Sequence, residues 1–164
     1  MSKTMDHLKE AFAGESQANR KYLAYAAQAE KEGHLGVAKL FKAAAAAETV
    51  HAHTHLRNMG GIRDTAANLQ DAIAGETHEF KSMYPGMIED AKAEGEKAAE
   101  RGFTFANAVE ELHANLYAEA AKDVAGYPEK DWYVCSVCGY TVAGAVPDKC
   151  PVCQALAKAF FKVD

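Results

Sequence analysis

Two copies of a Glu-x-x-His pattern are the residues of this chain best suited to chemistry. Glu48 and His51 follow a run of five alanines, and Glu110 and His113 repeat the pattern 62 residues later. Alanine is the strongest helix former, so the first pair is predicted to lie inside a helix. Residues three apart on a helix share one face, with Cβ atoms about 5–6 Å apart. Each pair is therefore predicted to present a carboxylate and an imidazole side by side.

The repeat extends back to a second pair of acids. Segment 10–16 reads EAFAGES and segment 71–77 reads DAIAGET, so Glu15 and Glu76 occupy matching positions. Such an internal repeat indicates two copies of one structural unit. Each copy is predicted to be a helical hairpin with a Glu on its first helix and Glu-x-x-His on its second. Glu79 lies one turn beyond Glu76 on the same face and has no acidic counterpart in the first copy.

Two such hairpins would gather the ligand set of a dinuclear carboxylate site in a four-helix bundle. Carboxylates with imidazoles suit iron or manganese. Two ferrous ions with five carboxylates carry the same net charge as two ferric ions with a bridging oxide, which suits two-electron chemistry on an O–O bond. The alternative is a bundle with buried structural Glu–His pairs. The predicted catalytic and metal-binding residues are Glu15, Glu48, His51, Glu76, Glu79, Glu110 and His113.

Three further side chains are placed near this site by the same periodicity. Tyr22 follows Glu15 by two turns, and Tyr84 lies five residues after Glu79. Each is either a core aromatic residue or a phenol that hydrogen-bonds a ligand glutamate. His55 is one turn beyond His51 and could support the metal ligands, whereas His53 points away from them.

The four cysteines form a second candidate metal site. All of them lie in two C-x-x-C pairs, Cys135 with Cys138 and Cys150 with Cys153. Four thiolates bind a tetrahedral metal, either zinc or a single iron, and the spacing does not distinguish the two. A structural zinc ribbon thus remains open, although the redox site next door favours an electron-carrying iron. This short, strand-like region would not fold without its metal.

Helical periodicity and turn residues predict the domain organisation. Residues 1–127 are predicted to be a four-helix bundle, and residues 128–164 a small metal-binding domain, so the fold class is mainly α. Thr4 is expected to cap the first helix, which should run to about residue 32. The second helix is expected at about 35–59, with an apolar stripe that includes Leu40. Thr65 is expected to cap the third helix, which Pro85 should kink or break. Thr104 is expected to cap the fourth helix, which should run to about residue 125.

Composition excludes several classes of function. The chain has 164 residues, 49% hydrophobic and 25% charged, with a net charge of −5. Such a chain offers no broad basic surface for nucleic acid or anionic membrane. The sequence shows no secretory signal and no apolar run of the roughly 20 residues that cross a bilayer. All four cysteines lie in C-x-x-C pairs, which favours metal binding over disulfide bonds and suits a reducing compartment. We therefore expect a cytoplasmic protein.

The motifs together resemble those of the rubrerythrin family, over essentially the whole length. The segment GESQANRKY at 14–22 and the tripeptide Met83-Tyr84-Pro85 carry the resemblance, with the paired Glu-x-x-His and C-x-x-C motifs. It implies a ferritin-like bundle with a non-haem di-iron site, followed by a rubredoxin-like domain. It also implies a peroxidase that reduces hydrogen peroxide to water in oxidative-stress defence, with its cysteine-bound iron relaying electrons. Reduced nicotinamide cofactor would be the distal electron source, through rubredoxin or a separate reductase.

The resemblance also implies roles for individual residues. Glu48 and Glu110 would bridge the irons, while Glu79 and His51 would exchange on one iron with redox state. The terminal ligands would be Glu15, Glu76 and His113. The sequence departs from the usual rubredoxin-like knuckles at Ser136 and Gln154, which bears on the choice of iron over zinc.

Assembly and competing functions follow from the same resemblance. Family members are typically homodimers or larger, with the cysteine site of one subunit near the di-iron site of another. We expect electron transfer between subunits, because three helical turns separate His113 from the end of its helix, about 18–20 Å, unless the small domain folds back. A ferritin-like ferrous iron oxidase is the main competing function, although iron storage needs no one-electron relay. A zinc-ribbon interaction protein with an idle bundle is a third, which the five in-register acids oppose.

Overall fold

The computed structural model describes residues 2–163, most of which are helical. The chain divides into two compact units, one that ends at Arg63 and one that begins at Asp64. Each unit contains one copy of the sequence repeat. Among the described residues, no helix combines the length and the hydropathy needed to cross a bilayer.

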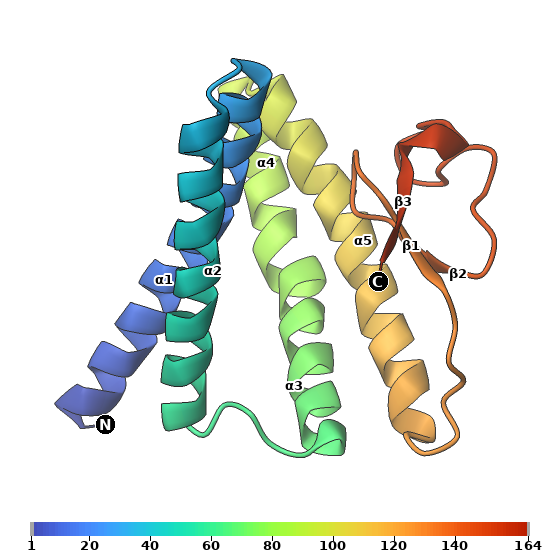
Figure 1. The fold of residues 1–164 in the computed structure, drawn as a ribbon. Coiled ribbons are helices and arrows are strands. Elements are labelled where there is room, and N and C mark those ends of the chain that lie inside the picture. The colour runs from blue at the N-terminus through green and yellow to red at the C-terminus, as the bar shows by residue number, and fades with distance from the viewer. Residues whose placement is uncertain (1, 164) are drawn as a thin grey trace. The chain divides into compact units, whose positions relative to one another are not determined.

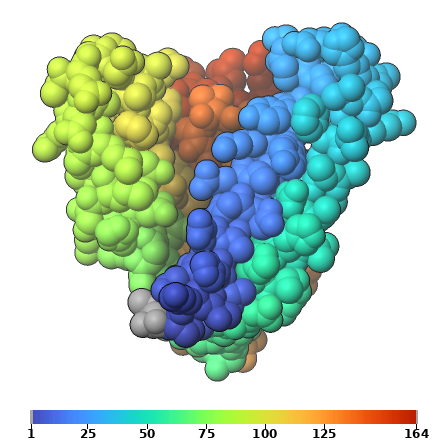
Figure 2. All heavy atoms as spheres, turned by 90° about the vertical axis from the view of Figure 1, so that its left-hand side faces the viewer, coloured from blue at the N-terminus to red at the C-terminus, as the bar shows by residue number. Residues whose placement is uncertain are grey.

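The first unit is a helical hairpin of α1 (Lys3–Lys31) and α2 (Leu35–Asn58). The α1 helix begins two residues earlier than predicted, because Ser2 rather than Thr4 is its cap and accepts from the backbone N–H of Met5. Gly33 makes the turn with φ of +84°, a conformation that glycine adopts without a steric penalty. Figures 1 and 2 show the two helices side by side along most of their length.

Small side chains let α1 and α2 approach closely. Asn19 on α1 donates to the carbonyl of Ala45 at 2.7 Å and to the hydroxyl of Thr49 at 2.9 Å, which ties the two backbones together. The predicted apolar stripe of α2 was wrong at Leu40, which is 69% exposed. It fails because the buried positions of α2 are alanines and Leu40 is not among them. The buried residues of the hairpin are Ala26, Ala29, Ala38, Ala45 and Ala52.

The second unit begins with a long helical segment that packs against α5 (Lys97–Lys122). This segment runs through α3 (Thr65–His78), the π-helical turn η1 (Glu79–Met83) and α4 (Tyr84–Glu94). Asp64, not Thr65, caps α3, since its carboxylate accepts from the N–H of Ala67 at 2.8 Å. The left-handed Gly95 ends α4.

Two expectations about these helices need correction. The α5 helix begins at Lys97 instead of Thr104, because residues 97–103 continue the helix after the Gly95 turn. The hydroxyl of Thr104 donates back to the carbonyl of Glu100 and caps nothing. Pro85 does not end its helix, but the π-helical turn η1 interrupts the regular α-helix directly before it, so the predicted local break is confirmed in part. It stands at the start of α4 directly after η1. The wider π-helical turn leaves room for the proline ring, and the first turn of a helix does not need the N–H that proline lacks.

A small antiparallel sheet follows α5 in the same unit. Its strands are β1 (Trp132–Cys135), β2 (Thr141–Ala143) and β3 (Phe160–Val163), in the order β2-β1-β3. A short 3₁₀ turn, η2 (Ala157–Ala159), precedes β3. The β2 strand contacts α5, and Figure 1 shows the sheet beside that helix. The predicted strand-like character of this region is confirmed, and the sheet returns alongside the helix that carries His113.

Candidate metal centres

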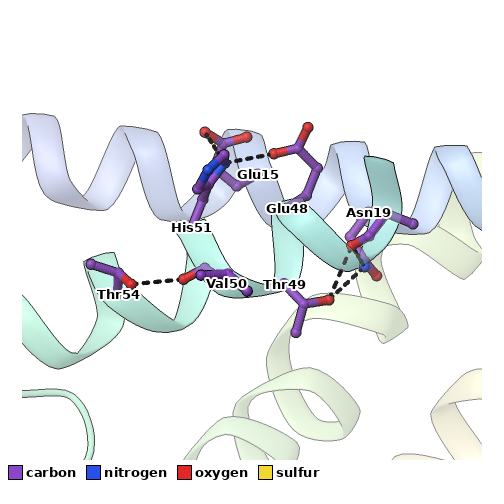
Figure 3. Close-up of polar contacts among 8 residues, drawn as sticks. Glu15, Asn19, Glu48, Thr49, Val50, His51 and Thr54 are labelled. Atoms are coloured by element: carbon purple, nitrogen blue, oxygen red, sulfur yellow. Dashed lines mark hydrogen bonds and ion pairs between the residues drawn. The ribbon is translucent and has the colours of Figure 1, made fainter. Parts of the chain in front are cut away.

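The first unit presents a three-residue set of metal ligands. Nδ1 of His51 lies 2.9 Å from Oε2 of Glu48 and 3.8 Å from Oε1 of Glu15. The three residues offer ligand atoms within 4.8 Å of one another. Figure 3 shows their side chains together on one side of α2, with Thr49 and Thr54 on another side. The helical spacing of Glu48 and His51 therefore produces the shared face that the sequence predicts.

The second unit repeats this geometry with the second copy of the motif. Nδ1 of His113 lies 2.8 Å from Oε2 of Glu110 and 3.9 Å from Oε2 of Glu76. The α3 helix supplies Glu76, and α5 supplies the other two residues. These ligand atoms also lie within 4.8 Å of one another. The two units thus reproduce the two corresponding distances to within 0.1 Å.

The carboxylates of the second unit repel one another. The pKa of Glu76 is raised from its usual 4.5 to about 7, first by burial, then by its hydrogen bond to Glu110 and by the charges of Glu110 and Glu79. A divalent cation at this point would relieve the repulsion and favour the ionised form. The donor set therefore fits a metal ion better than it fits a metal-free core.

A contact from the small sheet fixes the orientation of His113. Its Nε2 lies 3.0 Å from Oγ1 of Thr141, and the same hydroxyl donates to the carbonyl of Gly139 at 3.0 Å. Because the single hydroxyl proton is used on Gly139, Oγ1 must accept from Nε2–H of His113. The neutral imidazole then carries its lone pair on Nδ1, on the side of Glu110 and Glu76, which is the form that binds a metal.

Thr141 is a functional candidate that the sequence did not indicate. It lies 28 residues beyond His113, in a different element, and no periodicity links the two. The contact also corrects the expected separation of the two centres within one chain. The chain after α5 turns back, and a Cβ placed on Gly139 would lie only 3.6 Å from Cγ1 of Val109 on α5. The small domain therefore folds back along α5, which was the stated exception to the expected separation of about 18–20 Å.

Two tyrosines lie near the ligands of the second unit. Burial and the charges of Glu110, Glu79 and Glu76 raise the pKa of Tyr84. Burial and the charges of Glu76 and Glu110 raise the pKa of Tyr117, which sequence reasoning missed. Its position one helical turn beyond His113 was the available signal.

The remaining predicted site residues are placed less closely. Glu79 is near enough to influence Glu76 but lies outside the three-residue set. In the first unit, Tyr22 packs on Tyr25 and Phe41, with ring centroids 6.4 and 6.1 Å away, which favours the core interpretation. Nδ1 of His55 is buried with no hydrogen-bond partner among the described residues.

The four cysteines converge on one point. Sγ of Cys135 lies 3.6 Å from Sγ of Cys153, and Sγ of Cys138 lies 3.5 Å from Sγ of Cys150. A metal with sulfur ligands at about 2.3 Å in a tetrahedron requires S–S separations of about 3.8 Å. All four sulfurs lie within 4.8 Å of one another, so the set fits a tetrahedral metal.

The two cysteine turns are built alike. The N–H of Gly139 donates to the carbonyl of Cys135 at 2.8 Å, and the N–H of Gln154 donates to that of Cys150 at 2.9 Å. Gly139 has φ of +84°, and Gln154 has φ of +63°. Gln154 therefore holds the left-handed conformation that its glycine counterpart adopts freely.

The thiols differ in their readiness to ionise. Burial is the main cause that raises the pKa of Cys138. Burial acts on Cys150 too, but backbone N–H groups of Cys153 and Val152 outweigh it and lower the pKa of that thiol. Burial also raises the pKa of Cys153. Thiolates are the form that binds a metal, so the turn amides prepare Cys150 in particular for binding.

Comparison with known proteins decides the family. A family model described as Rubrerythrin matches residues 6–121. The chain belongs to the rubrerythrin family. A second model, described as Rubrerythrin, rubredoxin-like domain, matches residues 133–161, which contain all four cysteines.

Individual rubrerythrin relatives match most of the chain. Rubrerythrin-2 of Clostridium acetobutylicum is 36% identical, over 92% of this chain and 91% of its own. Nigerythrin of Nitratidesulfovibrio vulgaris is 35% identical, over 92% of this chain and 81% of its own. A solved structure of nigerythrin in a mixed-valent state is 31% identical, covers 99% of this chain and 88% of its own, and has a TM-score of 0.59.

Membership of the rubrerythrin family confirms the predicted fold class and cofactors. The chain is a ferritin-like four-helix protein with a rubredoxin-like C-terminal region. Its Glu/His site is a di-iron site, and its four-cysteine site is also an iron site. Rubrerythrins are oxidoreductases that generally reduce peroxide with rubredoxin-like electron donors.

Proposed function

We propose that this rubrerythrin reduces hydrogen peroxide to two molecules of water, and that its cysteine-bound iron supplies the electrons to the di-iron site. The contact that carries the proposal is the hydrogen bond from Nε2–H of His113 to Thr141. On one side its imidazole faces Glu110, and on the other it contacts Thr141, which bonds to Gly139 of the first cysteine turn. A continuous chain of bonded groups therefore joins the two centres within one unit.

The residues of the repeat would hold the di-iron site. Glu48 and Glu110 would be ligands of the di-iron site, and Cys135, Cys138, Cys150 and Cys153 would hold the relay iron. The remaining ligands would be Glu15, His51, Glu76, Glu79 and His113. The bound irons would supply two electrons to the O–O bond. The protein's part is to hold the carboxylates and imidazoles in a preset arrangement and to keep Nδ1 of His113 unprotonated.

The two imidazoles differ in a way that supports a redox-linked change of ligand. His113 is held at Nε2 by Thr141 and its side chain is 26% exposed. The side chain of His51 is 55% exposed, and no described residue bonds to its Nε2. The protein thus holds Nε2 of His113 but not Nε2 of His51. We infer that His51 and Glu79 exchange on one iron, with the imidazole bound in the reduced state and the carboxylate in the oxidised state.

An electron supply from outside the chain completes the cycle. We propose that reduced nicotinamide cofactor is the distal source, through a separate rubredoxin or reductase that delivers single electrons to the cysteine-bound iron. Peroxide cleavage consumes two electrons, and a four-thiolate iron carries one at a time. Two successive deliveries are therefore needed for each peroxide.

The test is a single-turnover experiment. The iron-loaded protein is reduced anaerobically and mixed with one equivalent of hydrogen peroxide, while the visible spectra of both iron centres are recorded. We expect oxidation of the di-iron site first and then of the cysteine-bound iron. Cysteine-bound iron that stays ferrous after the di-iron site is oxidised would contradict the relay. Faster oxidation by dioxygen than by peroxide would instead favour the ferrous iron oxidase.

A further inference from the structure

The ligands of the di-iron site are divided equally between the two units. Each unit gathers two carboxylates and one imidazole, which is half of the glutamates and histidines that such a site uses. In the first unit this half-site is open to water, because the side chain of His51 is 55% exposed and that of Glu15 is 32% exposed. Figure 3 shows the side chains of this half-site together on one side of α2.

The first unit also lacks a core of large side chains. Among its described residues, the buried side chains are all alanines. Larger apolar side chains on α2 are exposed instead, Val37 by 49% and Leu40 by 69%. Val37 lies eleven residues before Glu48, and Leu40 lies eleven residues before His51, which is about three helical turns on the same face. The open half-site and these exposed side chains therefore belong to one face of α2, which we call the ligand face.

The link between the two units is short. Six residues join Asn58 at the end of α2 to Thr65 at the start of α3. An extended chain covers at most about 3.6 Å per residue, so the seven steps between these two Cα atoms span at most about 25 Å. Both ends of the link are also fixed. The N–H of Gly61 donates to the carbonyl of Leu56 at 2.9 Å, and the carboxylate of Asp64 caps α3.

A ferritin-like bundle needs a longer connection than this link. It joins its two hairpins by one crossover that runs along the bundle, so the third helix begins at the end opposite to where the second stops. Asn58 lies about 15 Å along its helix from Glu48, and Thr65 lies about 16 Å along its helix from Glu76. With both glutamates at the level of the irons, the crossover must cover about 31 Å along the bundle, which exceeds the reach of the link.

We propose that the di-iron site is shared between two copies of this chain, with the ligand face of one copy against the second unit of the other. A second copy fits this face because it carries the missing half of the ligand set, and because its own short link leaves that half without a partner from the same chain. Such an exchange of identical units gives each dimer two complete sites. The shared site rests on the ligand assignment proposed above, and it does not depend on peroxide as the substrate.

Mixed dimers of full-length chains test the exchange directly. One chain carries Glu15→Ala and Glu48→Ala. The other carries Glu76→Ala and Glu110→Ala, and the two are co-expressed with different affinity tags. The readout is the iron bound outside the cysteine site, called bundle iron. Each variant alone should lose it, whereas the mixed dimer should regain one of its two sites, about half of the wild-type content.

The reciprocal dimer is the matched control. It combines a wild-type chain with a chain that carries all four substitutions, so both kinds of dimer contain the same changes. If two copies share each site, the reciprocal dimer has no complete site and should hold no bundle iron. If each chain builds its own site, the reciprocal dimer keeps one and the mixed dimer has none. Circular dichroism and the visible spectrum of the cysteine-bound iron show that every chain folds.

Three results overturn the proposal. These are a folded mixed dimer without bundle iron, a reciprocal dimer that retains it, or a wild-type monomer with its full bundle iron in analytical ultracentrifugation. Wild-type protein without bundle iron would overturn the ligand assignment and the shared site together. A mixed dimer that regains bundle iron but does not reduce peroxide would support the shared site and contradict the proposed function.

Discussion

The hydroxyl of Thr141 is the group whose removal tests the link between the two centres most directly. Thr141→Val keeps the shape of the side chain and removes only the hydroxyl. The change deletes the bond from Nε2–H of His113 and the bond to the carbonyl of Gly139, both 3.0 Å long. Each such bond contributes about 0.5–1.5 kcal/mol, so the free energy of unfolding of the second unit should fall by about 1–3 kcal/mol.

The larger effect is expected at the metal. Without Thr141, the imidazole of His113 can rotate and exchange tautomers, so Nδ1 no longer presents a lone pair towards Glu110 all the time. Removal of such outer partners typically lowers metal affinity or activity by about 10- to 100-fold. We expect a loss near the lower limit, about 10-fold, since a water molecule can reach the partly exposed ring and replace the hydroxyl. Re-oxidation of the cysteine-bound iron after peroxide should slow by a similar factor.

Chelator competition and stopped-flow spectroscopy measure the two effects separately. Thr104→Val is the matched control, because it removes a threonine hydroxyl on α5, the helix that carries His113, and that hydroxyl donates to the carbonyl of Glu100. Wild-type metal affinity together with wild-type re-oxidation in Thr141→Val would refute the reasoning, whatever happened to the stability. A slower re-oxidation with unchanged metal affinity would instead assign Thr141 to the electron path alone.

Three other outcomes are expected. Gly139→Ala should lower the stability of the metal-loaded protein by about 1–2 kcal/mol in thermal unfolding, because it places a Cβ on a left-handed backbone. Gln154→Gly should lower it less than Gly139→Ala does, because the relief of the left-handed backbone offsets the lost bond from Nε2 of Gln154 to the carbonyl of Cys150; an equal or larger loss in Gln154→Gly would contradict this. Metal-free protein should lose stability as the pH rises from 4.5 to 7, because a folded pKa of Glu76 raised to about 7 favours folding only while the acid is protonated. Urea unfolding at pH 5 and pH 8 measures this loss, which Glu76→Gln should reduce and which metal should reverse. Crystals in the two redox states should show His51 bound in the reduced form and Glu79 in the oxidised form, and identical ligation in both would exclude the exchange.

The sequence predicted what depends on helical periodicity. Glu48 and His51 share a face because they are three residues apart on a helix, and the repeat carried the same geometry to Glu110 and His113. Periodicity fixes neighbours on one helix, whereas contacts between elements depend on how the chain turns. Helical periodicity therefore could not predict the contact between Thr141 and His113.

The predicted boundaries of the helices were wrong for a different reason. Residues 97–103 contain several charged side chains, which occur both on solvent-exposed helices and in loops. Their composition therefore does not show whether the helix includes them. The true break is Gly95, whose left-handed conformation ends α4 two residues before α5 begins. Ser2 and Asp64 also capped their helices in preference to the threonines chosen from the sequence, because a cap is set by which side chain reaches a free N–H.

The π-helical turn lies where the two copies of the hairpin repeat differ in length. From the ligand Glu to the left-handed glycine the first copy spans 18 residues, Glu15 to Gly33, and the second spans 19, Glu76 to Gly95. From that glycine to the next ligand Glu, both copies span 15. The extra residue therefore lies in the segment that contains η1, where a single insertion widens one turn without ending the helix. The π-helical turn begins at Glu79, the one proposed ligand without an acidic counterpart in the first copy. The two copies therefore differ in length and in the number of ligand carboxylates within the same segment.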